Sequence, residues 1–181
     1  MKVINFILFQ TAWLVTLFSA AYGKPYIGII FTALWMTYHL FIACKQPKNE
    51  MMLLVIVAVL GWLLELSLVM SQLVSYPEQT MIGLLVPLWM VALWVNLTAT
   101  INFSLSWMNG RYFLAALFAA IAGPLSYFAG ERIGAIILHG YASLIAICLM
   151  WFFAMPFIFW LNNLIMEAKN LKQQIIPNGA E

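Results

Sequence analysis

Charged residues are scarce in this chain, and aspartate is absent altogether. Only 8% of the 181 residues are charged, whereas 65% are hydrophobic. A soluble domain usually carries about 25% charged residues, and a water-facing surface as apolar as this one would aggregate. The composition therefore excludes a soluble globular protein and predicts an integral membrane protein. The net charge of +2, without a basic stripe, gives no reason to expect a nucleic-acid partner.

Cysteine and histidine are equally scarce, with two of each. Cys44 and Cys148 are isolated, so they are interpreted as small core residues and not as a metal or redox motif. His39 and His139 fall at different depths of the predicted helices and cannot share a haem iron. Carboxylate pairs at helical spacing within a span, as di-metal bundles require, are absent, and so are the common hydrolase and nucleotide-binding motifs. We therefore expect no metal, no cofactor and no catalytic site.

Six apolar segments are long enough to cross a membrane, which takes about 20 residues of helix. They are residues 3–22, 26–44, 51–74, 81–107, 112–130 and 133–166, the last with its span nearer 141–164. The first segment resembles a signal peptide, but its apolar run exceeds the usual length of about 7–15 residues, so we expect it to be retained. The predicted fold is an all-α polytopic bundle of six transmembrane helices over residues 1–166, followed by a cytoplasmic polar tail at 167–181.

The orientation of the bundle follows from lysine and arginine in the short loops, because cytoplasmic loops carry an excess of both. With six spans and the N-terminus inside, only Lys24 and Arg132 fall on the outer side. The inner side holds Lys2, Lys45, Lys48, Arg111, Lys169 and Lys172. This bias predicts that both ends of the chain are cytoplasmic.

Glu65 is the strongest candidate for a functional residue. At a rise of 1.5 Å per residue it lies about 20 Å from the inner end of the third segment, well inside the membrane. A carboxylate at that depth costs about 2.5–3.5 kcal/mol, so it is expected to face the bundle and to have a partner. Arg132 and His139 are the charged candidates at matching depth, with Glu131 beside them. The hydroxyl of Ser126 or Tyr127 would serve a protonated acid. Glu65 is interpreted either as a proton or ligand site or as a polar link between helices.

A second polar cluster is predicted in the inner half of the membrane. His39 lies about 20 Å from the outer end of the second segment by the same rise. The inner half of the fourth segment carries polar residues, and Asn96 and Asn102 could approach His39. Such residues bind a ligand or, more often, hydrogen-bond neighbouring helices.

Small residues recur at intervals of four along the fifth segment, at Ala122, Ser126, Gly130 and Gly134. This spacing predicts a face that packs closely against another helix. Pro124 lies within the same stretch and is expected to kink the helix.

Three stretches resemble a bacterial family of small polytopic inner-membrane proteins, domain of unknown function 2878. They are FQTAW at 9–13, PLWMVALW at 87–94 continuing to SLSW at 104–107, and GPLSYFAGERIGA at 123–135. The resemblance covers most of the chain up to about Trp160 and implies a location in the bacterial inner membrane. Many relatives carry an acid near Glu65. The family has no established activity, but its members often sit beside fatty-acid-modifying enzymes. The resemblance thus implies a lipid-linked role, with membrane lipids and lipid-modifying enzymes as partners.

Two functions from different classes fit these observations. The leading hypothesis is a non-enzymatic membrane component that binds lipid or a membrane partner, since Trp62, Trp89 and Trp94 could line an apolar pocket. The alternative is a small proton-coupled transporter that uses Glu65, which would need a path for water to that residue. A membrane-embedded enzyme could use only Glu131 and His139 and is the least favoured class.

Overall fold

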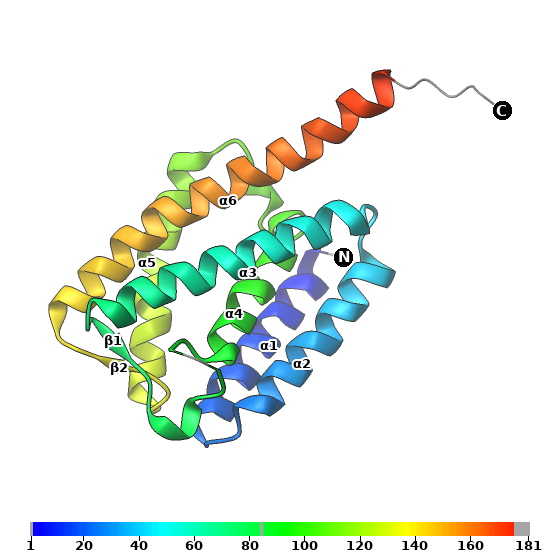
Figure 1. Cartoon of the computed structure of the whole chain (residues 1–181). Coiled ribbons are helices and arrows are strands. Elements are labelled where there is room, and N and C mark those ends of the chain that lie inside the picture. Colours follow the sequence, from blue (N-terminus) through cyan, green and yellow to red (C-terminus); the bar gives the residue numbers. More distant parts are fainter. Residues whose placement is uncertain (1, 84, 176–181) are drawn as a thin grey trace.

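The computed structural model describes residues 2–83 and 85–175, with side chains as far as Glu167. Within these residues the chain is almost entirely helical and forms six α-helices (Figure 1). Their bounds are α1 Lys2–Ala21, α2 Pro25–Tyr38, α3 Pro47–Met70, α4 Leu88–Ile101, α5 Tyr112–Arg132 and α6 Tyr141–Ile175. Shorter elements are the π-helical turn η1 His39–Ala43, the 3-10 turns η2 Glu78–Thr80 and η3 Ser106–Met108, and the strands β1 Val74–Ser75 and β2 Ile137–Leu138. The predicted all-α class is confirmed.

Five of the helices are long and apolar enough to cross a membrane, namely α1, α2 with its extension η1, α3, α5 and α6. The fourth predicted segment, 81–107, is different. Its helix α4 has only 14 residues and is about 21 Å long, shorter than a hydrocarbon core of about 30 Å. The expected continuous helix over 81–107 is therefore wrong in extent.

Backbone chemistry explains why α4 is short. Pro87 precedes the helix and cannot extend it backwards, and Gly83 has a φ of +123°, a conformation that ends regular structure. At the other end, Phe103 and Leu105 both donate their backbone N–H groups to the carbonyl oxygen of Thr100, which closes a turn.

The short helix α4 lies at the centre of the molecule, packed against α1, α2 and α3 (Figure 1). Its side chains are mostly buried, including the indoles of Trp89 and Trp94. Irregular backbone at membrane depth is tolerated where protein surrounds it, because its polar groups then find partners. The central position of α4 thus accounts for the irregular segments on either side of it.

The helices α5 and α6 form a hairpin. Within this hairpin, α6 is the helix that packs against α3. The connection after α3 and the connection after α5 are joined by an antiparallel pairing of β1 with β2, in which Val74 lies opposite Leu138 and Ser75 opposite Ile137. The sixth helix begins at Tyr141, which agrees with the expected span of 141–164. It continues to Ile175, so it includes part of the segment that was expected to be a polar tail. The last part of that segment, residues 176–181, lies outside the described residues.

The predicted packing face on α5 is only partly correct. The helix ends at Arg132, so Gly134, with a φ of +80°, lies beyond it. Ala122 is exposed, whereas Gly123 and Gly130 are buried. A Cβ atom on Gly123 would overlap the indole of Trp151. Close packing therefore uses Gly123, one position away from the expected face.

Candidate functional site

Glu65 is completely buried and accepts three hydrogen bonds from neutral side chains. The hydroxyl of Tyr76 donates to Oε2 over 2.8 Å, and Nε1 of Trp94 donates to Oε1 over 2.9 Å. The hydroxyl of Tyr127 also donates to Oε1. These donors come from the loop after β1, from α4 and from α5, so one carboxylate from α3 links four parts of the bundle.

The charged partners expected for Glu65 are found elsewhere, and this expectation was wrong. The guanidinium of Arg132 lies 4.7 Å from the ring centre of Phe128, one turn earlier on α5. Nε2 of His139 lies 2.9 Å from Oγ of Ser75, and the backbone N–H of His139 donates to Leu73.

Glu131, the acid beside Arg132 at the end of α5, accepts a hydrogen bond from the backbone N–H of Leu138 over 3.2 Å. The expectation was wrong because it used only the depth of each residue along its helix and not the direction in which its side chain points. Matching depth does not bring two side chains together when Arg132 lies in the last turn of α5 and His139 lies just after β2. Tyr127, slightly more than one turn before Arg132, is the α5 residue that points at Glu65. Of the two hydroxyls expected for a protonated acid, Tyr127 is therefore the one that reaches it, whereas Ser126 donates to the carbonyl oxygen of Gly123.

A stacked pair of indoles fixes the position of one of these donors. Trp94 on α4 and Trp151 on α6 are parallel within 2°, with ring centres 4.4 Å apart. Gly61 on α3 and Gly123 on α5 lie against the two indoles, and a Cβ atom at either glycine would overlap its ring. Four helices therefore hold Trp94 with its Nε1 directed at Glu65.

An apolar cavity of about 880 Å³ lies between α1 and α4 on one side and α5 and α6 on the other. Trp94 and Tyr127 form part of its wall and stand between the cavity and Glu65. Two lining side chains, Phe6 and Leu125, are also exposed on the outside of the bundle. The cavity therefore opens sideways, toward the lipid phase of a membrane. Of the predicted pocket residues Trp62, Trp89 and Trp94, only Trp94 lines it.

The second polar cluster forms around a residue that sequence reasoning missed, Glu50. Its Oε1 lies 3.1 Å from Nε2 of His39, and its Oε2 accepts a hydrogen bond of 2.8 Å from the side-chain amide of Asn102. Asn102 and Asn162 exchange two amide hydrogen bonds of 2.9 Å. Asn96 is not part of this cluster, since its amide donates to the carbonyl oxygen of Phe9 on α1. The expected grouping of His39, Asn96 and Asn102 is thus correct for two residues and wrong for the third.

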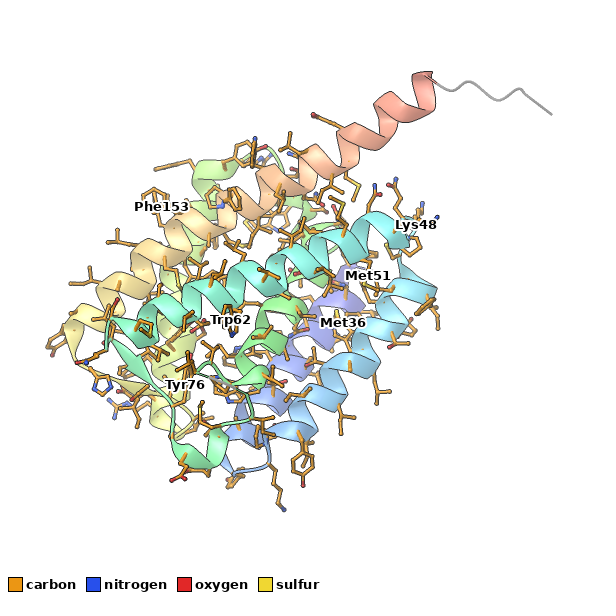
Figure 2. All side chains as sticks on the ribbon, viewed as in Figure 1. Met36, Lys48, Met51, Trp62, Tyr76 and Phe153 are labelled. Carbon is orange, nitrogen blue, oxygen red and sulfur yellow. The ribbon has the colours of Figure 1, made fainter. Side chains whose placement is uncertain are left out.

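A sequence signal for Glu50 was available. Proline favours the first position of a helix, and Pro47 begins α3 there, which places Glu50 in the first turn of the helix and not in a solvated loop. The side chain is 1% exposed and points into the bundle. Tyr76 and Lys48 lie toward opposite ends of α3 (Figure 2), so the Glu65 and Glu50 clusters occupy opposite halves of the molecule.

Cys44 completes a group that could hold a metal ion. One ligand atom from each of His39, Cys44 and Glu50 lies within 4.8 Å of the others. Burial raises the pKa of the Cys44 thiol, a hydrogen bond from the backbone of Gln46 lowers it, and the Glu50 carboxylate raises it. The net effect is upward, so without an ion the thiol is protonated at neutral pH.

The chain belongs to the family described as protein of unknown function (DUF2878), whose family model matches residues 2–157. This match confirms the family indicated by the three sequence stretches. Comparisons with curated proteins and with solved structures found no match. The family description names no activity, so the geometry of the two polar clusters and the cavity carries the functional argument.

Proposed function

We propose that this protein is a non-enzymatic component of the bacterial inner membrane that binds a membrane lipid in the cavity between α1, α4, α5 and α6. In this proposal both termini are cytoplasmic, and α4 with its flanking irregular segments makes the sixth crossing. The observation that carries the proposal is the cavity of about 880 Å³, which has an apolar lining and a sideways opening.

The size and lining of the cavity suit an acyl chain. Small-molecule sites in proteins usually measure about 300–1,000 Å³ and are mainly apolar. The cavity is lined along α1 from Lys2 to Leu17, a distance of about 22 Å. One leaflet of a membrane is about 15 Å deep in hydrocarbon, so a chain that enters sideways has room for its full length.

The charge at one end of the cavity favours an anionic head group. Lys2 lines the cavity at the start of α1, on the side that carries most of the cationic residues. An ammonium group near the membrane surface attracts anionic lipids by about 1 kcal/mol. We therefore commit to an anionic phospholipid with its head group near Lys2 and one chain in the cavity.

Glu65 has a structural role in this proposal. Its carboxylate has no exposed surface, and Trp94 and Tyr127 separate it from the cavity. A proton-coupled transporter that uses Glu65 would need water to reach this carboxylate, and three neutral donors occupy its oxygens here. By holding Trp94 and Tyr127 in place, Glu65 gives the cavity a rigid wall.

The test uses a variant that fills the cavity and a control on the same helix. Ala122 and its neighbour Ile121 are both exposed, but only Ala122 lines the cavity. Ala122→Phe should reduce the amount of phospholipid that co-purifies with the protein several-fold in native mass spectrometry, and Ile121→Phe should not. Equal lipid retention by the wild type and Ala122→Phe would refute the proposal.

The head-group assignment is tested separately. Lys2→Gln should lower the proportion of anionic lipid among the retained molecules, whereas Lys24→Gln, at the opposite end of α1, should leave it unchanged. If both variants retain the same lipids as the wild type, the cavity binds the chain without selecting the head group.

A further inference from the structure

We propose that His39, Cys44 and Glu50 form a binding site for one divalent transition-metal ion with the ligand preferences of zinc. The site lies where η1 meets the start of α3, at the end of the molecule opposite the β1–β2 pair (Figure 1). It does not depend on the proposed lipid function, because none of the three residues lines that cavity.

The local backbone explains why a histidine and a cysteine five positions apart meet. The chain leaves α2 through the π-helical turn η1, and the backbone N–H of Cys44 donates to the carbonyl oxygen of His39 over 2.8 Å. A π-helical turn inserts one extra residue into the helix and is often found at functional sites. Here it returns Cys44 to the side of His39, and Glu50 in the first turn of α3 closes the group.

The distances suit a small tetrahedral ion. Ligand atoms about 2.0–2.1 Å from a tetrahedral zinc ion lie about 3.3 Å from one another. Nε2 of His39 and Oε1 of Glu50 are 3.1 Å apart, so an ion can replace the hydrogen bond between them with little movement. The half-buried Cys44 lies in the short connection between η1 and α3, and its ligand atom is already within 4.8 Å of the other two.

The ligand set also identifies the class of metal. One thiolate, one imidazole and one carboxylate form a mixed set that suits zinc and its neighbours, whereas magnesium and calcium take oxygen ligands. The thiol binds as a thiolate, and its proton is released to the solvent when the bond to the metal forms.

Neighbouring residues already hold two of the ligands in position. The amide of Asn102 fixes Oε2 of Glu50, and Asn162 fixes the amide of Asn102 in turn, which leaves Oε1 free to face the ion. The imidazole of His39 is packed between the rings of Trp35 and Phe103. Its Nδ1 is buried and has no hydrogen-bond partner among the described residues, so packing and Glu50 orient the ring. Ordered supporting groups of this kind are typical of metal sites.

The experiment measures Co²⁺ binding to the untagged, chelator-treated protein in detergent. Cobalt bound to a thiolate gives a charge-transfer band in the near ultraviolet, so the band reports Cys44 directly. We expect one Co²⁺ per chain, displacement of the band by Zn²⁺, and loss of the band in Cys44→Ser. The matched control is Cys148→Ser on α6, the other free cysteine, which should keep the band.

Two further measurements distinguish ligand loss from misfolding. Zn²⁺ should raise the thermal midpoint of the wild type and of Cys148→Ser, but not that of Cys44→Ser. Asn102→Ala, which removes a supporting group only, should weaken Co²⁺ binding by about 10–100-fold while keeping the thiolate band at saturation. The proposal is overturned if the wild type shows no thiolate band, or if the band survives in Cys44→Ser.

Discussion

Replacing Glu65 with leucine and with glutamine separates a need for hydrogen-bond acceptors from a need for a carboxylate. Both oxygens of Glu65 accept hydrogen bonds, and all three donors are neutral. Leucine removes every acceptor, whereas glutamine keeps one carbonyl oxygen and puts an NH₂ group in the other position. The two variants therefore predict different changes in the free energy of unfolding.

The structure indicates how glutamine satisfies the site. Its carbonyl oxygen can take the place of Oε1, where Trp94 and Tyr127 both donate. Its NH₂ group then takes the place of Oε2 and donates to the hydroxyl of Tyr76, which can accept as well as donate. Every group keeps a partner, so we expect Glu65→Gln to change the free energy of unfolding by less than about 1 kcal/mol.

Leucine leaves two donors with no route to water. The side chains of Trp94 and Tyr127 are 2% and 3% exposed, whereas Tyr76, in the connection that follows β1, is half-buried. An unpaired buried donor costs about 1–3 kcal/mol. Glu65→Leu should therefore destabilise the protein by at least about 2 kcal/mol. For a chain of this length that is a drop of at least about 4–8 °C in the thermal midpoint.

The assay is thermal unfolding of the purified variants in one detergent, followed by tryptophan fluorescence and by size-exclusion chromatography after heating. Tyr127→Phe serves as an internal control. In the Glu65→Leu background it removes an unpaired hydroxyl and should recover about 1 kcal/mol or more, whereas in the wild type it should be destabilising. The reasoning is refuted if Glu65→Leu is as stable as the wild type, or if Tyr127→Phe fails to improve it. If Glu65→Gln is as harmful as leucine, the site needs a carboxylate and the transporter hypothesis gains support.

Three further predictions follow from the packing and the charges. Gly123→Ala should destabilise by about 1–3 kcal/mol through overpacking against Trp151, measured by the same unfolding assay, with exposed Leu125→Ala as a milder control. Arg132→Gln should change the thermal midpoint little, because its contact with Phe128 is worth about 0.5–1 kcal/mol at an exposed site; a loss of several kcal/mol would reveal a partner for Arg132. Reporter fusions after Lys48 should read as cytoplasmic and those after Gln79 as periplasmic, and the reverse result would refute the orientation.

The sequence was sufficient to predict helices but not the way that α4 is interrupted. Hydropathy treats residues 81–107 as one apolar run, because Gly83 and Pro87 are too few to lower its average. Pro87 immediately before α4 and Gly83 a few residues earlier were signals in the sequence for a later start, and the structure gives Gly83 a positive φ. The end of the helix near Asn102 carries no comparable signal, since the turn there is closed by backbone hydrogen bonds to Thr100.

For the candidate site, the sequence predicts how deep a residue lies but not which residues it contacts. Depth along a helix follows from counting residues, and it correctly places Glu65 inside the bundle and away from the ends. The direction in which a side chain points depends on helix rotation and packing, which a chain with weak amphipathic patterning does not encode visibly. Tyr127 is the α5 residue that reaches Glu65, and Trp151 supports Trp94 from α6. Tyr127 was one of two hydroxyl partners expected for a protonated Glu65, but the choice between Tyr127 and Ser126 and the support from Trp151 required the three-dimensional arrangement.

The positions of the two acids suggest why a small apolar bundle keeps them. Helices in a membrane gain little from the hydrophobic effect when they associate, because lipid is as apolar as their side chains. Glu65 joins α3, α4 and α5 at one end, and Glu50 joins α3 to η1 and the end of α4 at the other. With α3 fixed to α4 at both ends, the hairpin of α5 and α6 can stand apart from α1 without the bundle collapsing. On this argument the cavity persists because two polar links in opposite halves of α3 replace the helix contacts that would otherwise close it.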